Sequence, residues 1–365
     1  MISDFFFNLK NKSETFLIKC TLSCWFISKL LAWKVFTSYR IFPIIPVFKF
    51  LNIQAASVHN ILFIVSLLLM LFYVFFKQQK YILILILLLE TCSCLLDINR
   101  LQPWEYLFSL IIFAFIVNKY HAFLTVFIAI LSFTYLYSGF FKLNPLFLKN
   151  IWKFLILHNY LGLNQTLATN KWIYHSGYLF ALLELLSGIG LLFIKTRKWS
   201  ALILILMHII VLIILGPIGL NFNYTIWPWN VIMIIFLFFL LQNQNFKIAS
   251  LVLFSKWNKL IFFLVAILPF FNLFGFTDAN LSFRMYTGNS KSCKIILKDT
   301  AKANMLKYYF KENNSNNKIQ YYISIDGWAM QEMKVPVYSE KRVYDAIDEH
   351  LKTKIDSAAF DLYVY

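Results

Sequence analysis

The sequence predicts an all-α polytopic membrane bundle followed by a small C-terminal α+β soluble domain. Of its 365 residues, 60% are hydrophobic and only 14% are charged. A water-soluble domain is about half apolar and about a quarter charged, so this chain has more apolar surface than an aqueous fold can bury. The apolar residues also gather in long runs separated by short basic or proline-containing breaks. Runs of that kind are typical of helices that cross a bilayer.

We predict eight or nine transmembrane helices within residues 1–276. The candidate runs, in order along the chain, are about 16–36, 57–76, 81–97, 105–118, 121–141, 174–194, 200–216, 227–241 and 259–276. The first of them contains Lys19, Lys29 and Lys34. It therefore either crosses the bilayer or lies in its interface, and that choice separates nine spans from eight.

The net charge of +17 is concentrated in the apolar part of the chain. Residues 1–276 hold 21 of the 34 Lys and Arg residues but only six of the 17 Asp and Glu residues. Most of these cations lie between apolar runs, where they contact membrane lipid and set topology, so nucleic-acid binding is not predicted. The basic turn Lys195–Lys198 predicts a cytoplasmic connection, which places the C-terminal domain outside the cytoplasm of a multi-pass cell-membrane protein.

Residues 277–365 have the composition of a soluble domain, with Asn, Lys, Asp and Ser interleaved among Tyr and Ile. The predicted elements are strands at Leu281–Thr287, Cys293–Leu297 and Phe360–Tyr365, helices at Ala301–Phe310 and Glu340–Leu351, a loop at Asn313–Asn317, and a hairpin over Lys318–Val335 that turns at Asp326-Gly327. A domain of this size can bury a modest core. Binding an extracytoplasmic protein partner is one role open to it.

Charged residues at or within apolar runs are the first candidates for a functional site, because each costs about 2.5–3.5 kcal/mol at the centre of a membrane helix. Lys142 ends a run in which Tyr135, Ser138, Gly139 and Lys142 share one helix face. A desolvated lysine can have a lowered pKa and act as a catalytic base. The alternative is a lysine that snorkels to the interface from the end of its helix.

Two further candidate catalytic residues, Glu184 and His208, lie in later runs. A buried carboxylate must be protonated or paired, and a lysine of a neighbouring span is one partner that Glu184 could have. Purely structural roles stay open for both residues: a carboxyl group hydrogen-bonded between helices, and an imidazole satisfied in a helix core. The helix face of Glu184 otherwise carries small residues that permit close packing, namely Gly177, Ala181 and Gly188.

The segment 216–230 combines helix-breaking Gly and Pro with amide and indole side chains. This density predicts contacts with a substrate, and an aromatic belt with an ordinary loop is the alternative. The predicted substrate-binding residues are Tyr135, Asn221, Asn223, Trp227 and Asn230.

A polar turn at a membrane edge contains Asp97, Arg100 and Trp104. We interpret it as a structural polar cluster, with a functional site as the competing interpretation. The five cysteines form no C-x-x-C pair and have no histidine at zinc-ligand spacing, so no metal site is predicted.

Two of these motifs resemble known families. The segment Tyr137-Ser-Gly-Phe-Phe-Lys-Leu-Asn-Pro145 and the turn Leu96–Trp104 resemble bacterial membrane proteins similar to vitamin K-dependent γ-glutamyl carboxylase, called horizontally transferred transmembrane (HTTM) proteins. The stretch from Ser138 to His208 is also similar to the DoxX and MauE group. The resemblance covers roughly residues 17–276.

The carboxylase resemblance implies a membrane lysine, matched by Lys142, that acts as a base on a reduced quinone-like cofactor. The DoxX resemblance implies a redox-associated membrane subunit. The sequence departs from the carboxylase in two ways. The further catalytic histidines of the carboxylase find no match here, and residues 277–365 are far fewer than the lumenal part of the carboxylase.

Two functions therefore follow from the sequence. The first is a membrane enzyme or redox-associated subunit that binds a quinone-like or lipid-soluble compound in a pocket lined by Lys142, Glu184, His208 and the segment 221–230. The second is a non-enzymatic membrane scaffold whose exported C-terminal domain binds a partner. The first function requires Lys142, Glu184 and His208 to lie around one cavity, whereas the second is favoured if they point separately to a lipid edge, a loop and a packed interface.

Overall fold

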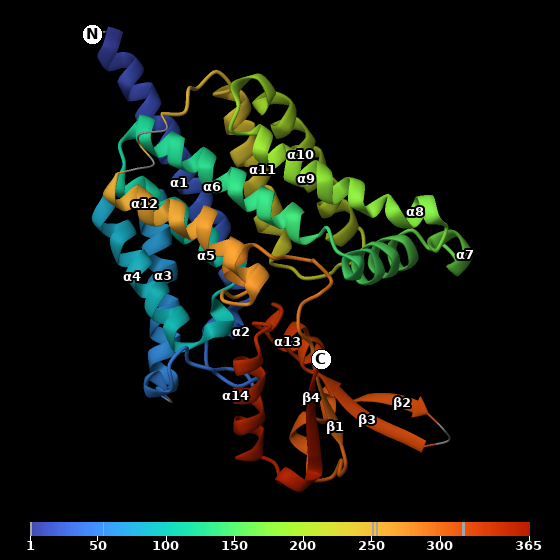
Figure 1. Ribbon diagram of the computed structural model, residues 1–365. Coiled ribbons are helices and arrows are strands. Elements are labelled where there is room, and N and C mark those ends of the chain that lie inside the picture. The colour runs from blue at the N-terminus through green and yellow to red at the C-terminus, as the bar shows by residue number, and fades with distance from the viewer. Residues whose placement is uncertain (1, 54, 250–251, 253–254, 316–317) are drawn as a thin grey trace. The chain divides into compact units, whose positions relative to one another are not determined.

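The computed structural model describes residues 2–53, 55–249, 252, 255–315 and 318–365 (Figure 1). The chain forms two compact units. The helical unit comprises Met1–Leu30, Val65–Leu89 and Pro103–Asn289, and the sheet unit comprises Leu31–Ile64, Glu90–Gln102 and Ser290–Tyr365. The unit that contains the C-terminal sheet therefore also includes two segments from the first third of the chain.

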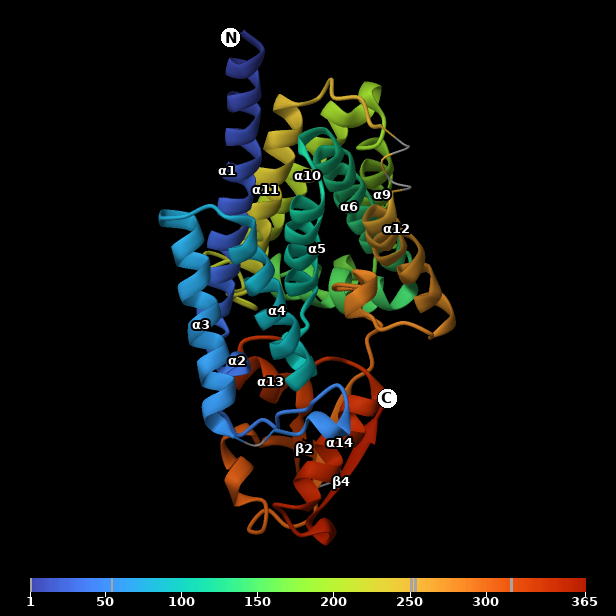
Figure 2. The same cartoon turned by 90° about the vertical axis from the view of Figure 1, so that its left-hand side faces the viewer.

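Helices build almost all of the helical unit. Its elements are α1 (Ile2–Leu31), α5 (Pro103–Val117), α6 (Tyr120–Phe141), η3 (Phe147–Tyr160), α7 (Gln165–Ala168), α8 (Lys171–His175), α9 (Gly177–Gly190), α10 (Ile194–Leu215), α11 (Ile226–Gln242), α12 (Lys256–Phe262), η5 (Phe263–Ile267), η6 (Leu268–Phe274) and η7 (Asn280–Ser282). Two more helices, α3 (Ala56–Phe75) and α4 (Lys80–Leu96), have residues in both units. Helix α6 packs on α9, α9 on α10, and α10 on α11 (Figure 1, Figure 2).

Four helical segments in the described chain are long and apolar enough to cross a membrane: Ala56–Phe75, His121–Phe141, Ile194–Leu215 and Lys256–Phe274. Two shorter apolar helices, Pro103–Val117 and Ile226–Gln242, cover two more of the predicted runs. A helix needs about 20 apolar residues to cross the hydrocarbon core without help from its neighbours. The membrane-helical character of the fold is thus supported, while eight or nine spans stays a prediction.

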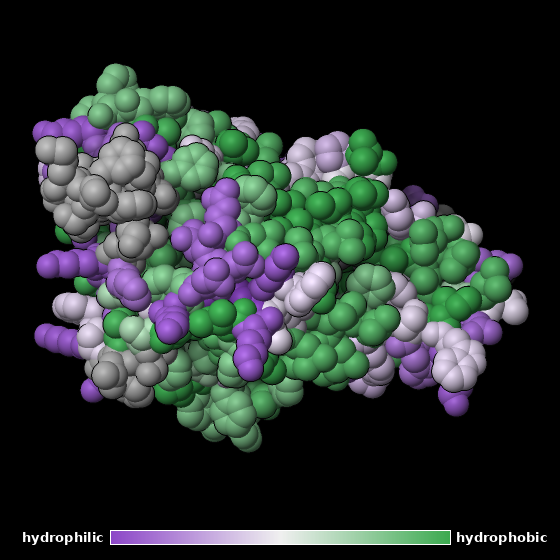
Figure 3. Space-filling view, turned by 90° about the horizontal axis from the view of Figure 1, so that it is seen from above, coloured by the Kyte–Doolittle hydropathy of each residue, from purple (hydrophilic) through white to green (hydrophobic). Residues whose placement is uncertain are grey.

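The helical unit exposes apolar side chains at helical spacing, as a lipid-facing surface requires. On α10, the side chains of Leu202, Leu206, Ile209 and Ile213 are exposed at intervals of four, three and four residues. Only 22% of the apolar window of Ile194–Leu215 is buried. Figure 3 shows hydrophobic side chains over large parts of the surface seen from above.

One cation of the predicted basic turn, Arg197, lies in the first turn of α10 and is used inside the fold. The guanidinium of Arg197 is fully buried and donates to the carbonyl oxygens of Leu191 at 2.8 Å, Gln244 at 3.1 Å and Phe246 at 2.6 Å. It thereby ties the carboxyl end of α9 to the segment after α11. A positive charge is favourable at the carboxyl end of α9 because the helix dipole is negative there.

The sheet unit contains a four-stranded antiparallel sheet in the order β2-β3-β1-β4. Its elements are α2 (Trp33–Phe36), η1 (Lys49–Leu51), η2 (Ile98–Arg100), β1 (Cys293–Leu297), η8 (Asn304–Tyr309), β2 (Lys311–Ser315), β3 (Lys318–Ser324), α13 (Ile325–Met333), α14 (Lys341–Lys352), η9 (Ser357–Ala359) and β4 (Phe360–Val364). In the register, Ile295 of β1 lies opposite Ile323 of β3 on one side and Leu362 of β4 on the other. The predicted strand at Cys293–Leu297, the C-terminal strand and the helix near 340–351 are confirmed.

The predicted hairpin over Lys318–Val335 is wrong in its second half, because α13 follows β3 directly. The Ser324 side chain accepts a hydrogen bond from the Gly327 amide, which caps the amino end of α13. The buried residues of this helix recur at intervals of three, one, three and one: Ile325, Trp328, Ala329, Glu332 and Met333. That spacing is helical, and the Asp-Gly pair belongs to a capped helix start rather than a β-turn.

Three other predictions for the tail are corrected. Residues 281–287 are not a strand, because Phe283 and Tyr286 have φ values of 53° and 52°, which a strand does not allow. The helix predicted at Ala301–Phe310 is reduced to the short 3₁₀-helix η8. Residues 313–315 of the predicted Asn-rich loop belong to β2, and its last two residues, 316 and 317, lie outside the described residues.

Candidate functional site

Lys142 and Glu184 form an ion pair inside the helical unit. Lys142 follows the last residue of α6, and its Nζ atom lies 2.6 Å from Oε2 of Glu184 in α9. The same ammonium group donates to the hydroxyl of Ser138 at 2.7 Å, one turn earlier on α6. The two charged side chains are only 16% and 12% exposed, so the pair is largely shielded from solvent. Lys142 therefore has a specific partner at the end of α6.

Small residues bring α6 and α9 close enough for this pair. A β-carbon on Gly139 of α6 would fall 2.7 Å from the carbonyl oxygen of Ala181. A β-carbon on Gly188 of α9 would fall 2.6 Å from the amide nitrogen of Leu136. Neither distance is compatible with a side chain, so these glycines permit the backbone contact that the small face of α9 predicts.

A second polar group links α6, α10 and α11. The phenol oxygen of Tyr135 lies 2.7 Å from Nε2 of His208, and Nδ1 of His208 lies 2.6 Å from Oδ1 of Asn230. The amide nitrogen of Asn230 donates to the carbonyl oxygen of Ile226 at 2.8 Å, so Oδ1 is the amide atom that faces the imidazole. Because Oδ1 is an acceptor, His208 carries its proton on Nδ1, and Nε2 accepts from the Tyr135 hydroxyl.

The two polar groups are neighbours. His208 interacts electrostatically with both Glu184 and Lys142, and Tyr135 interacts electrostatically with Glu184. The structure thus brings together the three predicted catalytic residues, Lys142, Glu184 and His208, with the predicted substrate-binding residues Tyr135 and Asn230. Four helices contribute to this group, so no single helix carries the information that assembles it.

The other predicted substrate-binding residues build the connection between α10 and α11. Asn221 and Asn223 adopt left-handed backbone angles, with φ values of 48° and 52°, as asparagine tolerates better than most residues. The Asn223 side chain donates to the Tyr286 hydroxyl at 3.0 Å, and the Trp227 indole nitrogen lies 3.4 Å from the carbonyl oxygen of Leu215. These contacts shape the loop, and a contact of Asn221, Asn223 or Trp227 with a substrate stays a prediction.

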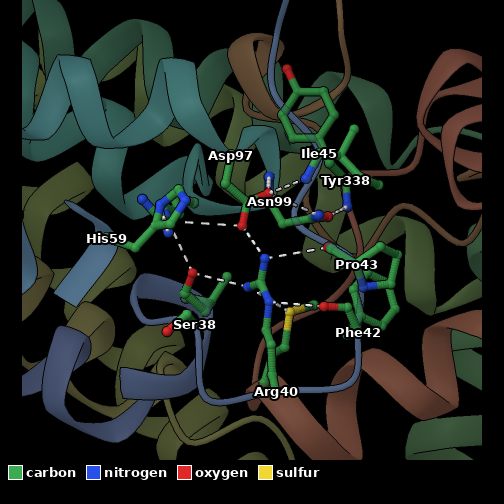
Figure 4. Close-up of polar contacts among 12 residues, drawn as sticks. Ser38, Arg40, Phe42, Pro43, Ile45, His59, Asp97, Asn99 and Tyr338 are labelled. Carbon is green, nitrogen blue, oxygen red and sulfur yellow. Dashed lines mark hydrogen bonds and ion pairs between the residues drawn. The ribbon is translucent and has the colours of Figure 1, made fainter. Parts of the chain in front are cut away.

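The predicted polar cluster lies in the sheet unit and is larger than the sequence indicates (Figure 4). The Asp97 carboxylate forms a fully buried ion pair with Arg40 and lies 3.7 Å from the guanidinium of Arg100. It also accepts from the backbone amides of Ile45 at 3.3 Å and Asn99 at 3.2 Å. Trp104, the third predicted member, belongs to the helical unit, where its ring lies 6.3 Å from that of Phe108.

Arg100 is held by a histidine that the sequence analysis did not single out. Its guanidinium donates to Nδ1 of His59 at 3.0 Å and to the hydroxyl of Ser93 at 3.1 Å. Since Nδ1 accepts, His59 carries its proton on Nε2 and donates to the carbonyl oxygen of Ile53 at 3.0 Å. The result is a closed network in which each ring nitrogen has a defined role.

The same cluster ties the C-terminal part of the sheet unit to its early segments. The Glu332 carboxylate accepts from the amides of Ile41 at 2.5 Å and Phe42 at 3.0 Å, and the Asn99 side chain accepts from the Tyr338 amide at 3.1 Å. The local sequence around Glu332 and Arg40 does not mark either residue as a member of this cluster. They could be found only by knowing which distant segments meet.

Within the part of the chain that the structure describes, no group of three or more His, Cys, Asp or Glu side chains could hold a metal ion. Comparison with known proteins adds no relative: no protein-family model matches the chain, and no curated protein or solved structure matches it significantly.

Proposed function

We propose that this protein is a membrane protein that binds a quinone-like, lipid-soluble compound and exchanges a proton with it. The observation that carries the proposal is the hydrogen-bonded chain Tyr135–His208–Asn230 beside the Lys142–Glu184 pair. Polar and charged groups held together among apolar helices are costly, and in membrane proteins they mark substrate sites and proton relays by default.

The tautomer of His208 defines the direction of proton transfer. The Tyr135 hydroxyl donates to Nε2, which leaves the phenol oxygen able to accept a hydrogen bond from a hydroxyl group of the bound compound. When that hydroxyl gives up its proton, Tyr135 passes its own proton to Nε2 of His208. The resulting imidazolium is stabilised by the Asn230 carbonyl oxygen on Nδ1 and by the negative charge of Glu184.

Lys142 is suited to bind an oxygen of the same compound. Its ammonium group has three donors, and among the described residues Ser138 and Glu184 accept two of them. The third can donate to a carbonyl or phenolate oxygen, the group in which a quinone and its reduced form differ. The ion pair with Glu184 keeps the ammonium oriented.

We propose further that the chain is a distant relative of the HTTM and DoxX-like membrane proteins. The motif around Lys142 and the later run around Glu184 carry that proposal. The ion pair between Lys142 at the end of α6 and Glu184 in α9 supports it, because it joins the two motifs in one polar group.

The first test compares two tyrosines of the same helix. Tyr135→Phe removes the hydroxyl that donates a hydrogen bond to Nε2 of His208, while Tyr137→Phe removes a hydroxyl that donates to the carbonyl oxygen of Ala266. Each variant is purified in detergent, and its bound quinones and lipids are identified by mass spectrometry. We expect Tyr135→Phe to retain about tenfold less of the quinone-like compound, the cost of about one hydrogen bond, and Tyr137→Phe to retain it as the wild type does. Equal retention in both variants, or no such compound in the wild type, would overturn the proposal.

We also propose that Lys195–Lys198 faces the cytoplasm and that the C-terminal domain lies outside it. A fluorescent reporter that folds only in the cytoplasm, fused after Tyr365, should stay dark. The same reporter fused after Lys198 in a shortened chain should fluoresce, which controls for expression. Fluorescence from the fusion at Tyr365 would refute this topology.

A second function, binding of a partner by the sheet unit, is favoured by one observation. A cavity of about 470 Å³ lies between the segment 40–46 and one face of α14. Lys49 and Glu349 pair across it at 3.2 Å, and burial lowers the pKa of His350, which also lines it. A scaffold role predicts that the Tyr135 and Tyr137 variants behave alike, while Glu349→Lys, which repels Lys49, weakens partner binding.

A further inference from the structure

The connection between α6 and α9, residues 146–176, combines basic and apolar side chains with no acidic residue. It contains η3, α7 and α8 and carries Lys149, Lys153 and Lys171. From Glu105 to Glu184 the sequence has no Asp or Glu in between, so the positive charge of this connection is not offset locally. Among the described residues, no ion pair joins any of these three lysines to a carboxylate.

The connection is a folded piece of the helical unit and not a loose loop. The indole nitrogen of Trp152 in η3 donates to the carbonyl oxygen of Ile173 in α8 at 2.9 Å. A β-carbon on Gly177 would fall 2.6 Å from the Trp152 ring, so this glycine lets η3 pack tightly against the start of α9. The side chains of Asn164 and Asn170 cap α7 and α8. Figure 1 shows these elements grouped beyond one end of α6 and α9.

The outer surface of the connection exposes large apolar side chains next to its lysines. Trp172 is 85% exposed and directly follows Lys171, and Phe154, 60% exposed, directly follows Lys153. Leu161 and Leu167 are 53% and 46% exposed. An indole exposed to this extent is unfavourable in water, whereas Trp is enriched where a bilayer meets water.

We infer that the 146–176 connection lies in the headgroup layer of the membrane and binds anionic phospholipids. The lysines supply charge for the lipid phosphates, and Trp172, Phe154 and the exposed leucines supply apolar contact with the upper acyl chains. Because the connection begins directly after the α6 end that carries Lys142, it gathers these lipids at the same end of the bundle as the Lys142–Glu184 pair. This inference concerns a surface and does not depend on the chemistry proposed for that pair.

The test uses the full chain in nanodiscs of phosphatidylcholine, with or without phosphatidylglycerol. In the test variant Lys149, Lys153 and Lys171 become Gln. In the matched control Lys298, Lys302 and Lys352 become Gln, which removes the same charge from exposed lysines of the sheet unit that pair with Asp361, Asp356 and Asp348. Bound lipid is counted by native mass spectrometry after mild detergent extraction, and melting temperatures report that both variants are folded.

We expect the wild type and the control to retain phosphatidylglycerol over phosphatidylcholine, and the test variant to lose this preference by about tenfold to a hundredfold. Rising salt concentration should release the lipid from the wild type. Lipids with brominated acyl chains should quench the tryptophan fluorescence of the wild-type protein more than that of a Trp172→Phe variant. Equal loss in the test and control variants would overturn the inference. The inference would also be overturned if the wild type retained phosphatidylglycerol and phosphatidylcholine equally, and this measurement needs no variant.

Two competitors distinguish other ligands. Inorganic phosphate at the lipid concentration should not displace phosphatidylglycerol, because it offers no apolar contact, and displacement would assign the lysines to a free phosphate site. A soluble poly-glutamate peptide should not displace it either. Displacement by the peptide would identify the surface as a docking site for an acidic protein and refute lipid binding.

Discussion

Lys142→Met is expected to destabilise the protein by about 2–4 kcal/mol and to abolish retention of its ligand. The substitution removes a cation that lies 2.6 Å from Oε2 of Glu184 and leaves that carboxylate without its partner in a shielded place. Glu184→Leu should cost a similar amount, because it leaves the ammonium of Lys142 without a counter-charge. The double variant Lys142→Met/Glu184→Leu should recover most of the stability, since two apolar residues replace both charges. It should not recover ligand binding.

Thermal unfolding in detergent of the four proteins gives the coupling energy of the pair. If the single variants had the melting temperature of the wild type, the pair would contribute no more to stability than a surface salt bridge, about 0–1 kcal/mol. Lys142→Arg separates charge from chemistry: a guanidinium can still pair with Glu184, so stability should hold, but its fixed fork cannot place a single donor as an ammonium does. Full ligand retention in Lys142→Arg would refute a chemical role for the lysine.

Asp97→Asn is expected to destabilise the sheet unit by about 3–5 kcal/mol, because it removes a buried charge between two buried arginines. The side chains of Asp97, Arg40 and Arg100 are fully buried, and the carboxylate also accepts the amides of Ile45 and Asn99. An asparagine keeps one acceptor oxygen but leaves the guanidinium of Arg40 uncompensated. The matched control is Asp361→Asn, whose carboxylate pairs with Lys298 on the surface and is 40% exposed.

Amide hydrogen exchange of β1 and β3 measures the effect in the full chain, because these central strands open only when the sheet unit unfolds. The exchange rates of β1 and β3 in Asp97→Asn should approach those of an unfolded segment. In Asp361→Asn, the free energy of opening that these rates report should change by less than about 1 kcal/mol. Similar exchange rates in the two variants would mean that the cluster around Asp97 contributes little to the stability of the sheet unit.

Local patterns in the sequence were sufficient where one element buries one face. The alternation of Cys293, Ile295 and Leu297 marks β1, and the spacing of Val343, Tyr344, Ile347 and Leu351 marks α14, whose positions the structure confirms. The helix face shared by Tyr135, Ser138 and Lys142 was also visible, because positions three and four residues apart on a helix are neighbours. The same logic failed at α13, where an Asp-Gly pair suggested a turn although the buried residues recur with the helical period.

By itself the sequence determined that the chain is mostly helical, with apolar helices long enough to cross a membrane and a small mixed tail, because composition and apolar run length depend on the solvent and not on the fold. It also pointed to Lys142, Glu184 and His208 one by one, since each is polar at an apolar place. Only the tertiary structure decided that they meet, that Asn230 sets the tautomer of His208, and that Arg40 and Glu332 join the cluster around Asp97. Contacts between distant segments depend on which helices pack together and at what depth, and periodicity within one helix carries no record of the residue that faces it from another.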